Sequence, residues 1–249
     1  MSDETACLTR RSRNNRGQEL SAIRASVVRM TTFVLVPGMW LGASAWRDVV
    51  SPLTALGHSA YPLDLSLEPG TDLDAHVAEV VAVLEKDDLR DVVLVGHSYG
   101  GMVVSTAAGQ VADRVARVVY LDSGPLPDGM SQFDTTSPEE QEQTRASVVD
   151  GLVPVPEHLR AEGRPHPFAS VTQGVHYTPE YATLPQTLIT CSFPADQVRG
   201  MIAAGHPFFA KLEGADVVDL PGDHWPMFSR PGELAEVLAA LPSGRPSSR

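Results

Sequence analysis

The segment that most constrains the fold of this chain is VVLVGHSYGGM, residues 92–102. Four apolar residues precede a G-x-S-x-G sequence, and small or apolar residues without a helix breaker follow it. The pattern predicts a buried strand, a tight turn and a helix, with Ser98 held out at the turn as in a nucleophile elbow. Glycines at this turn allow the chain to pass close to itself. The dipole of the following helix favours negative charge that develops at the serine.

Length and charge limit the classes of protein to consider. The chain has 249 residues, enough for one large α/β domain or two small ones. Its net charge of −12 argues against nucleic acid and anionic membranes as partners. No apolar run approaches the roughly 18 residues of a membrane helix. We therefore expect a globular protein that acts on a small molecule, and leave open whether it forms a homodimer.

Two further compositional features concern location and source. The two cysteines, Cys7 and Cys191, form neither a disulfide framework nor a metal-binding pattern. This usage suits a reducing cytoplasm, and we expect neither a metal nor an organic cofactor. The chain has two lysines beside 17 arginines, which favours a bacterial source.

The first 29 residues differ from the rest of the chain. They hold six arginines against three acidic residues and lack a continuous apolar segment, so they do not resemble a secretory signal. We interpret residues 1–29 as a disordered basic extension, with Met30 as an alternative start; an Arg/Ser-rich transit peptide is the other interpretation.

Strand-like and helix-like segments alternate along the chain. Alternation of this kind implies parallel pairing with right-handed crossovers. We therefore expect an α/β fold with a mostly parallel sheet of about six strands flanked by helices. The expected strands are 32–36, 58–63, 92–95, 116–121, 185–191 and 216–220, and the expected helices are 43–56, 73–84, 99–110 and 233–241.

Residues 124–184 interrupt this alternation. The segment is rich in proline, glycine and acidic residues and contains no clear buried strand. Sixty residues without structure are improbable inside a compact domain, so we expect a cap inserted into the core. The core would then comprise residues 30–123 and 185–243.

A serine nucleophile needs a base, and in this architecture the base follows both the serine and the acid in the chain. His224 is the best candidate because it follows the expected strand 216–220 in a loop shaped by glycine and proline. His206 is its main rival. His97 lies inside the elbow but points the wrong way. The histidines of the expected cap are interpreted as exposed loop residues that could touch substrate: His158, His166 and His176.

The acid should also follow a strand. Asp196 is the best candidate, since it comes in the turn after the expected strand 185–191. Asp122, at the end of the preceding strand, is the runner-up. Asp196 could alternatively cap a helix.

An oxyanion hole requires two backbone N–H donors. One should come from Tyr99, the residue after the serine, and the other from Met39 in the loop after the first strand. Trp40, Phe168 and Trp225 are the residues expected to contact an apolar substrate.

Three segments resemble the α/β-hydrolase superfamily. They are FVLVPGMWLGASAW at 33–46, GHSYGG at 96–101 and VYLDSGPLPDG at 119–129. The nearest subgroup is that of the plant methyl salicylate esterases and hydroxynitrile lyases, with their bacterial relatives. The resemblance covers about residues 32–241 and implies a Ser-His-Asp hydrolase.

Two departures from that subgroup affect the expected chemistry. Pro37 stands where the family usually has histidine, which should reshape the oxyanion loop without removing its N–H groups. The lyases carry lysine directly after the catalytic histidine, whereas this chain has Trp225, which argues against a lyase.

We therefore expect a serine esterase that cleaves a small, largely apolar carboxylic ester or lactone through an acyl-enzyme. Ser98, His224 and Asp196 are the expected triad. The alternative is a non-hydrolytic lyase or cyclising enzyme that uses Ser98 and His224 as an acid/base pair, since fold does not fix function. A ligand-binding receptor on the same fold is the third hypothesis.

Overall fold

The computed structural model describes residues 30–242 of the chain. A six-stranded sheet forms its centre, in the order β2-β1-β3-β4-β7-β8, and every pair of neighbouring strands is parallel. The expected parallel α/β sheet is therefore confirmed. The strands are β1 (Thr32–Val36), β2 (Ser59–Pro62), β3 (Val92–His97), β4 (Val115–Leu121), β7 (Gln186–Thr190) and β8 (Asp216–Asp219).

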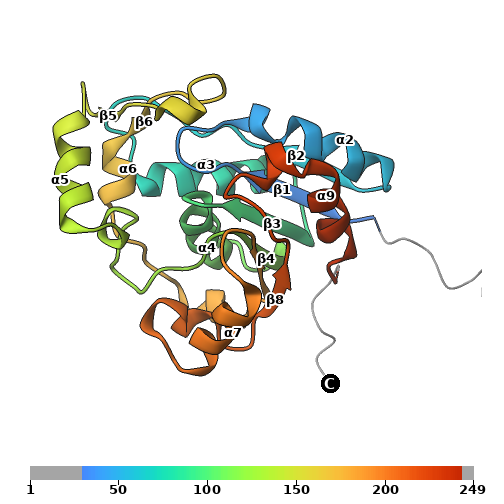
Figure 1. Cartoon of the computed structure of the whole chain (residues 1–249). Helices are drawn as coiled ribbons and strands as arrows, with labels where there is room; N and C mark the ends of the chain where they lie inside the picture. The colour runs from blue at the N-terminus through green and yellow to red at the C-terminus, as the bar shows by residue number, and fades with distance from the viewer. Residues whose placement is uncertain (1–29, 243–249) are drawn as a thin grey trace, which may run out of the picture. The chain divides into compact units, whose positions relative to one another are not determined.

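Helices cover both faces of this sheet (Figure 1). Helices α2 (Arg47–Ala55) and α9 (Pro231–Ala240) pack together on one face, and α3 (Leu73–Lys86) and α4 (Gly100–Gln110) on the other. The expected helix at 43–56 begins as a 3-10 turn, η1 (Ala43–Trp46). Each helix pair has its own apolar core against the sheet.

Strand β3 shows how the sequence produces this layering. All of its residues are buried, as a central parallel strand requires. Val92 and Leu94 join the core beneath α3 and α4, whereas Val93 and Val95 join the core beneath α2 and α9. Because side chains alternate between the faces of a strand, one apolar run serves both layers.

Residues 124–184, which we call the connecting segment, join two neighbouring strands, β4 and β7. The segment supplies no strand to the central sheet among the described residues. Its elements are short: η2 (Phe133–Thr135), α5 (Pro138–Ser147), β5 (Leu152–Val153), η3 (Glu157–Leu159), β6 (His166–Pro167), α6 (Phe168–Thr172) and η4 (Pro179–Thr183). The sequence pattern did not predict these elements.

The chain after β7 also contains elements that the sequence pattern did not predict. They are α7 (Ala195–Ala203), η5 (Pro207–Leu212) and α8 (Pro226–Ser229). Figure 1 shows α7 below the sheet, close to β8. Val198 of α7 and Leu212 of η5 join the core on the face of the sheet that α3 and α4 cover.

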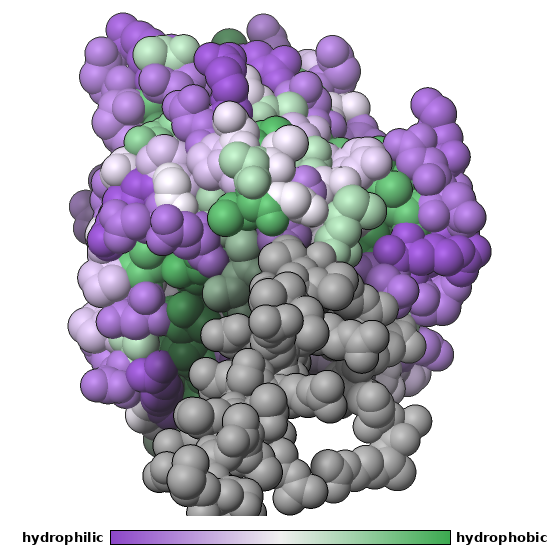
Figure 2. Space-filling model, turned by 90° about the vertical axis from the view of Figure 1, so that its right-hand side faces the viewer, coloured by the Kyte–Doolittle hydropathy of each residue, from purple (hydrophilic) through white to green (hydrophobic). Residues whose placement is uncertain are grey.

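Hydrophilic residues gather on the upper part and right edge of the face in Figure 2, with smaller apolar patches between them. In residues 30–242, no helix is long and apolar enough to cross a membrane. The interpretation of residues 1–29 as a basic extension lies outside the described residues.

Candidate active site

The turn at Ser98 has the backbone geometry of a strained elbow. Ser98 has φ +50°, a conformation that residues with a Cβ rarely adopt. A Cβ on Gly96 would lie 2.3 Å from the carbonyl oxygen of Gly100, and one on Gly100 would lie 2.6 Å from that of Pro37. The glycines of the motif are therefore required by close packing between strand β3, helix α4 and the end of β1.

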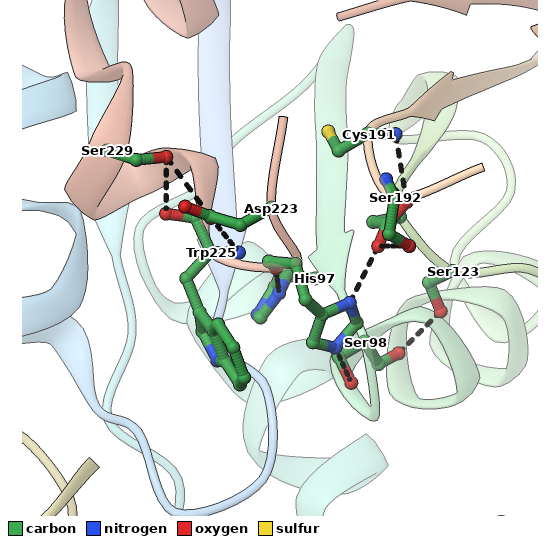
Figure 3. A network of polar contacts seen from close by, with 10 residues as sticks. His97, Ser98, Ser123, Cys191, Ser192, Asp223, Trp225 and Ser229 are labelled. Carbon is green, nitrogen blue, oxygen red and sulfur yellow. Dashed lines mark hydrogen bonds and ion pairs between the residues drawn. The ribbon is translucent and has the colours of Figure 1, made fainter. Parts of the chain in front are cut away.

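Ser98, His224 and Asp122 form a chain of hydrogen bonds (Figure 3). His224 Nε2 lies 2.9 Å from Ser98 Oγ, and His224 Nδ1 lies 2.7 Å from Asp122 Oδ2. The three residues follow strands β3, β8 and β4, whose carboxyl ends meet at one edge of the sheet. In such an arrangement the imidazole can take the serine proton while the carboxylate holds the ring.

Asp122 is buried and fully hydrogen-bonded. Its side chain is 3% exposed. Oδ1 accepts the backbone N–H groups of Cys191 and Ser192 at 2.8 and 3.0 Å, and Oδ2 accepts the Ser192 hydroxyl at 2.6 Å. Burial acts to raise the pKa of this carboxyl, but the hydrogen bonds from His224, Ser192 and the two N–H groups outweigh it and lower the pKa to about 2. Asp122 is therefore a carboxylate at neutral pH.

The expectation that Asp196 orients the histidine is wrong. Asp196 lies in the first turn of α7, where its side chain is 96% exposed and pairs with Arg199 at 2.8 Å. The loop after β7 does contribute to the site, but through Cys191 and Ser192, which donate to Asp122. The acid, Asp122, thus follows strand β4, and the residues that donate to it follow the neighbouring strand β7.

His97, inside the elbow, forms a hydrogen bond with the backbone of His224. Its Nε2–H donates to the carbonyl oxygen of His224 at 2.7 Å. Burial, and then the neighbouring His224, lower the pKa of His97 to about 3, so its ring stays neutral. The rival base His206 is exposed and instead caps η5 by accepting the N–H of Phe208.

The loop after β1 lies directly against the elbow. A Cβ on Gly38 would meet His97 Nδ1 at 2.6 Å and Ser98 Cβ at 3.1 Å. Gly38 is therefore needed for close approach, while the positive φ in this loop belongs to Trp40, at +67°. Within residues 30–242, no hydrogen bond uses the backbone N–H of Met39 or Tyr99, the two expected oxyanion donors.

The residues expected to contact substrate are placed in three different surroundings. Trp40 donates its indole N–H to the carbonyl oxygen of Val153 in the connecting segment. Phe168 packs edge-on against Phe133 in the same segment. The ring of Trp225 lies 5.2 Å from that of His224, also edge-on.

None of these three residues lines the apolar pocket that adjoins Asp122. This pocket has a volume of about 210 Å³ and lies between the start of the connecting segment and the α7–η5 region. Its lining includes Ser123, Leu126, Val198, Met201 and Phe209. The pocket offers an apolar surface next to Asp122 of this hydrogen-bonded chain.

Sequence reasoning missed several residues that support the site. Ser123 donates its hydroxyl to the carbonyl oxygen of Ser98 at 2.5 Å, and Ser192 holds Asp122. Their positions directly after strands β4 and β7 were an available signal. His166, interpreted as an exposed loop residue, is instead buried, with 1% exposure. Exposed positions were correctly expected for His158 and His176.

Residues 30–242 contain no cluster of three or more histidine, cysteine, aspartate or glutamate side chains that could hold a metal ion. The site described above is built from a serine, a histidine and a carboxylate. Residues 33–237 match the family model described as "Alpha/beta hydrolase family". The chain belongs to the α/β-hydrolase family.

Named esterases are among the relatives of this α/β-hydrolase. It is 31% identical to the carbendazim hydrolyzing esterase of Nocardioides sp. (strain SG-4G), over 85% of this chain and 100% of that protein. It is 28% identical to methylesterase 7 of Arabidopsis thaliana, over 84% of this chain and 95% of that protein. These relatives agree with the subgroup that the sequence resembles.

A solved structure has the same fold as this chain. It is an extracellular α/β-hydrolase from a Paenibacillus species, described as sharing structural and functional homology with tobacco salicylic acid binding protein 2. The two superpose with a TM-score of 0.72 at 23% identity, covering 87% of this chain and 100% of the other. At this identity the likeness shows the fold alone.

Proposed function

We propose that this chain is a carboxylic ester hydrolase that cleaves a small, largely apolar ester or lactone through an acyl-enzyme. The observation that carries the proposal is the continuous hydrogen-bonded chain from Ser98 Oγ through His224 to Asp122. The esterases among its relatives support the reaction class.

In the first half-reaction Ser98 Oγ attacks the ester carbonyl carbon and transfers its proton to His224 Nε2. The imidazolium that forms is stabilised by Asp122, which stays ionised. When the tetrahedral intermediate collapses, His224 returns the proton to the leaving alcohol and the acyl group remains on Ser98. In the second half-reaction water gives its proton to His224 and attacks the acyl carbon. When this second tetrahedral intermediate collapses, the bond to Ser98 Oγ breaks, His224 returns the proton to Oγ, and the acid is released.

Negative charge develops on the carbonyl oxygen in both half-reactions. The backbone N–H groups of Met39 and Tyr99 are the proposed donors to this oxyanion. Loss of one such donor typically lowers kcat by about 10² to 10³. The N-terminal end of helix α4 lies directly after Ser98 and favours the same charge.

The pocket beside Asp122 is the proposed site for an apolar group of the substrate. Its lining side chains are mostly apolar, and Ser123, one of the lining residues, donates to the carbonyl oxygen of Ser98. A pocket of this size can take a short alkyl chain or one ring of the substrate. Small methyl esters and carbendazim belong in the substrate panel because the relatives' names suggest them.

The test is a hydrolysis screen with p-nitrophenyl acetate, p-nitrophenyl butyrate, methyl salicylate, carbendazim and γ-lactones. Wild-type protein should hydrolyse at least one activated ester, and rapid quenching should show Ser98 carrying the acyl mass. The Ser98→Ala and His224→Gln variants should lose both turnover and adduct. Turnover retained by Ser98→Ala would contradict the proposal, and an acyl adduct on Ser98 would exclude the non-hydrolytic alternative.

A further inference from the structure

Trp40, next to the proposed oxyanion donor Met39, has an unusual backbone. Its φ of +67° lies in the left-handed region that a bulky residue rarely adopts. Such a conformation persists only where the surroundings hold it in place. The contacts of Trp40 therefore determine the shape of the loop that faces Ser98.

Three hydrogen bonds hold Trp40, and all three partners belong to the connecting segment. The backbone N–H of Trp40 donates to His166 Nδ1 at 3.3 Å. Its indole N–H donates to the carbonyl oxygen of Val153 at 3.3 Å, and its carbonyl oxygen accepts the N–H of Arg164 at 2.8 Å. Val153 and His166 face each other across the two-stranded sheet of β5 and β6, labelled in Figure 1.

Gly163 allows this close approach. A Cβ at that position would lie 3.4 Å from Trp40 Cβ and 2.7 Å from a methyl group of Val155. The connecting segment thus forms hydrogen bonds with both the backbone and the side chain of Trp40.

His166 is oriented for its contact by a further chain of hydrogen bonds. Its Nε2–H donates to Ser170 Oγ at 3.0 Å, and the Ser170 hydroxyl donates to the carbonyl oxygen of Pro167 at 2.8 Å. Nδ1 is then the unprotonated nitrogen, free to accept the N–H of Trp40. Burial, and then the nearby His76, lower the pKa of His166 to about 3, so the ring remains an acceptor at neutral pH.

The same histidine also packs against the residue that follows the nucleophile. The rings of His166 and Tyr99 lie 5.0 Å apart, edge to face. Tyr99 donates its hydroxyl to His76 Nδ1 at 2.8 Å, and His76 Nε2–H donates to the carbonyl oxygen of Ser66 at 2.7 Å. His166 therefore contacts Tyr99, one of the two proposed oxyanion donors, and Trp40, the residue next to the other.

We infer that His166 is a positioning residue, through which the connecting segment holds Trp40 in its strained conformation and keeps the Met39 N–H directed at the oxyanion. The inference rests on the proposed function. If the contact at Nδ1 is lost, Trp40 can relax to a negative φ, which turns the peptide between Met39 and Trp40 and moves the preceding N–H. The segment then controls the rate without touching the reacting atoms.

The experiment compares His166→Leu, which removes the acceptor, with His166→Asn, whose side-chain oxygen can replace Nδ1. The matched control is His176→Leu, at an exposed histidine of the same segment. With p-nitrophenyl acetate, His166→Leu should lose roughly 10- to 100-fold in kcat, less than the full loss of a donor, with KM nearly unchanged. His166→Asn should recover most of that loss, and His176→Leu should match wild type.

Two further readouts separate positioning from general loss of structure. Amide hydrogen exchange of residues 37–42, followed by mass spectrometry, should be faster in His166→Leu and close to wild type in His166→Asn. Trp40→Phe, which loses only the bond to Val153, should lower kcat by a smaller factor than His166→Leu. It also serves as the second variant if His166→Leu does not fold.

The outcomes distinguish this inference from the proposed function. If wild type hydrolyses esters but the His166 variants equal it in kcat and exchange, the inference is overturned and the function stands. The inference would also be overturned if His166→Asn and His166→Leu lost kcat equally and in proportion to the fall in their melting temperatures. If wild type hydrolyses no ester, the proposed function fails, and the exchange measurement still decides whether His166 holds the loop.

Discussion

His224 Nδ1–H donates a 2.7 Å hydrogen bond to the carboxylate of Asp122, the residue directly after strand β4. The carboxylate is held from the other side by the hydroxyl and N–H of Ser192, which follows strand β7. The segments that follow two neighbouring strands, β4 and β7, thus together position one carboxylate.

Asp122→Asn should abolish most of the activity. The amide cannot stabilise the imidazolium and favours the wrong histidine tautomer, a change that costs a related triad about 10⁴ in kcat. Asp196→Asn is the matched control and should retain wild-type kcat, because Asp196 is exposed and contacts Arg199. Steady-state hydrolysis of p-nitrophenyl butyrate by both variants measures the difference. A large loss in Asp196→Asn with little loss in Asp122→Asn would contradict the assignment.

Sequence reasoning found the serine and the histidine but preferred Asp196 to Asp122 as the acid, and the structure places Asp122 beside the histidine instead. Both aspartates follow apolar β-prone runs, and local sequence does not state which carboxylate reaches the imidazole. The choice depends on the left-handed backbone of Asp122, with φ +45°, and on donors from residues 191 and 192. Neither of these appears in a hydrophobic pattern.

The core was predictable because its strands are apolar runs of the right length between helices. Strand β3 and helix α4 agree with the sequence in position and type. The connecting segment was not predictable, because its short elements are stabilised by contacts distant in sequence. The bond between Trp40 and His166 spans 126 residues, so no local pattern could reveal that this histidine is buried.

Ser192→Ala should lower kcat by about tenfold, since a hydrogen bond to a charged group contributes roughly 1.5–3 kcal/mol. Without the hydroxyl at 2.6 Å, Asp122 is less firmly oriented and its pKa rises. Ser229→Ala is the control, because it removes a serine hydroxyl from another carboxylate, that of Asp223. Equal kcat values for the two variants would argue against a role for Ser192.

Gly96→Ala should destabilise the fold, because the added Cβ would lie 2.3 Å from the carbonyl oxygen of Gly100. Overpacking of this kind costs about 1–3 kcal/mol. Gly200→Ala is the matched control in α7, where an added Cβ meets nothing within 4 Å. It should raise the free energy of unfolding by up to about 1 kcal/mol, since alanine favours a helix over glycine. Urea unfolding measures both, and a stable Gly96→Ala protein would contradict the packing argument.

Filling the pocket beside Asp122 should change substrate preference. Met201→Trp places a larger side chain among the lining residues. Hydrolysis of p-nitrophenyl butyrate should then show a raised KM, while that of p-nitrophenyl acetate stays near wild type. Leu56→Trp, at an exposed residue outside this lining, provides the control. Equal effects on both esters would show that the substrate's apolar group binds elsewhere.

Acid stability should depend on the buried histidines. Burial lowers the pKa of His97 and of His166 to about 3, whereas the unfolded chain binds these protons near 6.5. Below pH 6.5 the unfolded state therefore binds more protons than the folded state, so stability falls with falling pH, down to about pH 3. The slope is about 1.4 kcal/mol per pH unit for each histidine.

His166→Asn removes one of these titrating groups and keeps an acceptor for Trp40. Its free energy of unfolding should therefore fall less than that of wild type between pH 6.5 and 4.5, because asparagine takes up no proton on unfolding. The exposed His176→Asn serves as the control and should keep the wild-type slope, since it is solvated in both states. Urea unfolding at several pH values measures the slopes. Parallel curves for wild type and His166→Asn would mean that His166 is protonated in the folded protein, and a protonated Nδ1 could not accept the N–H of Trp40.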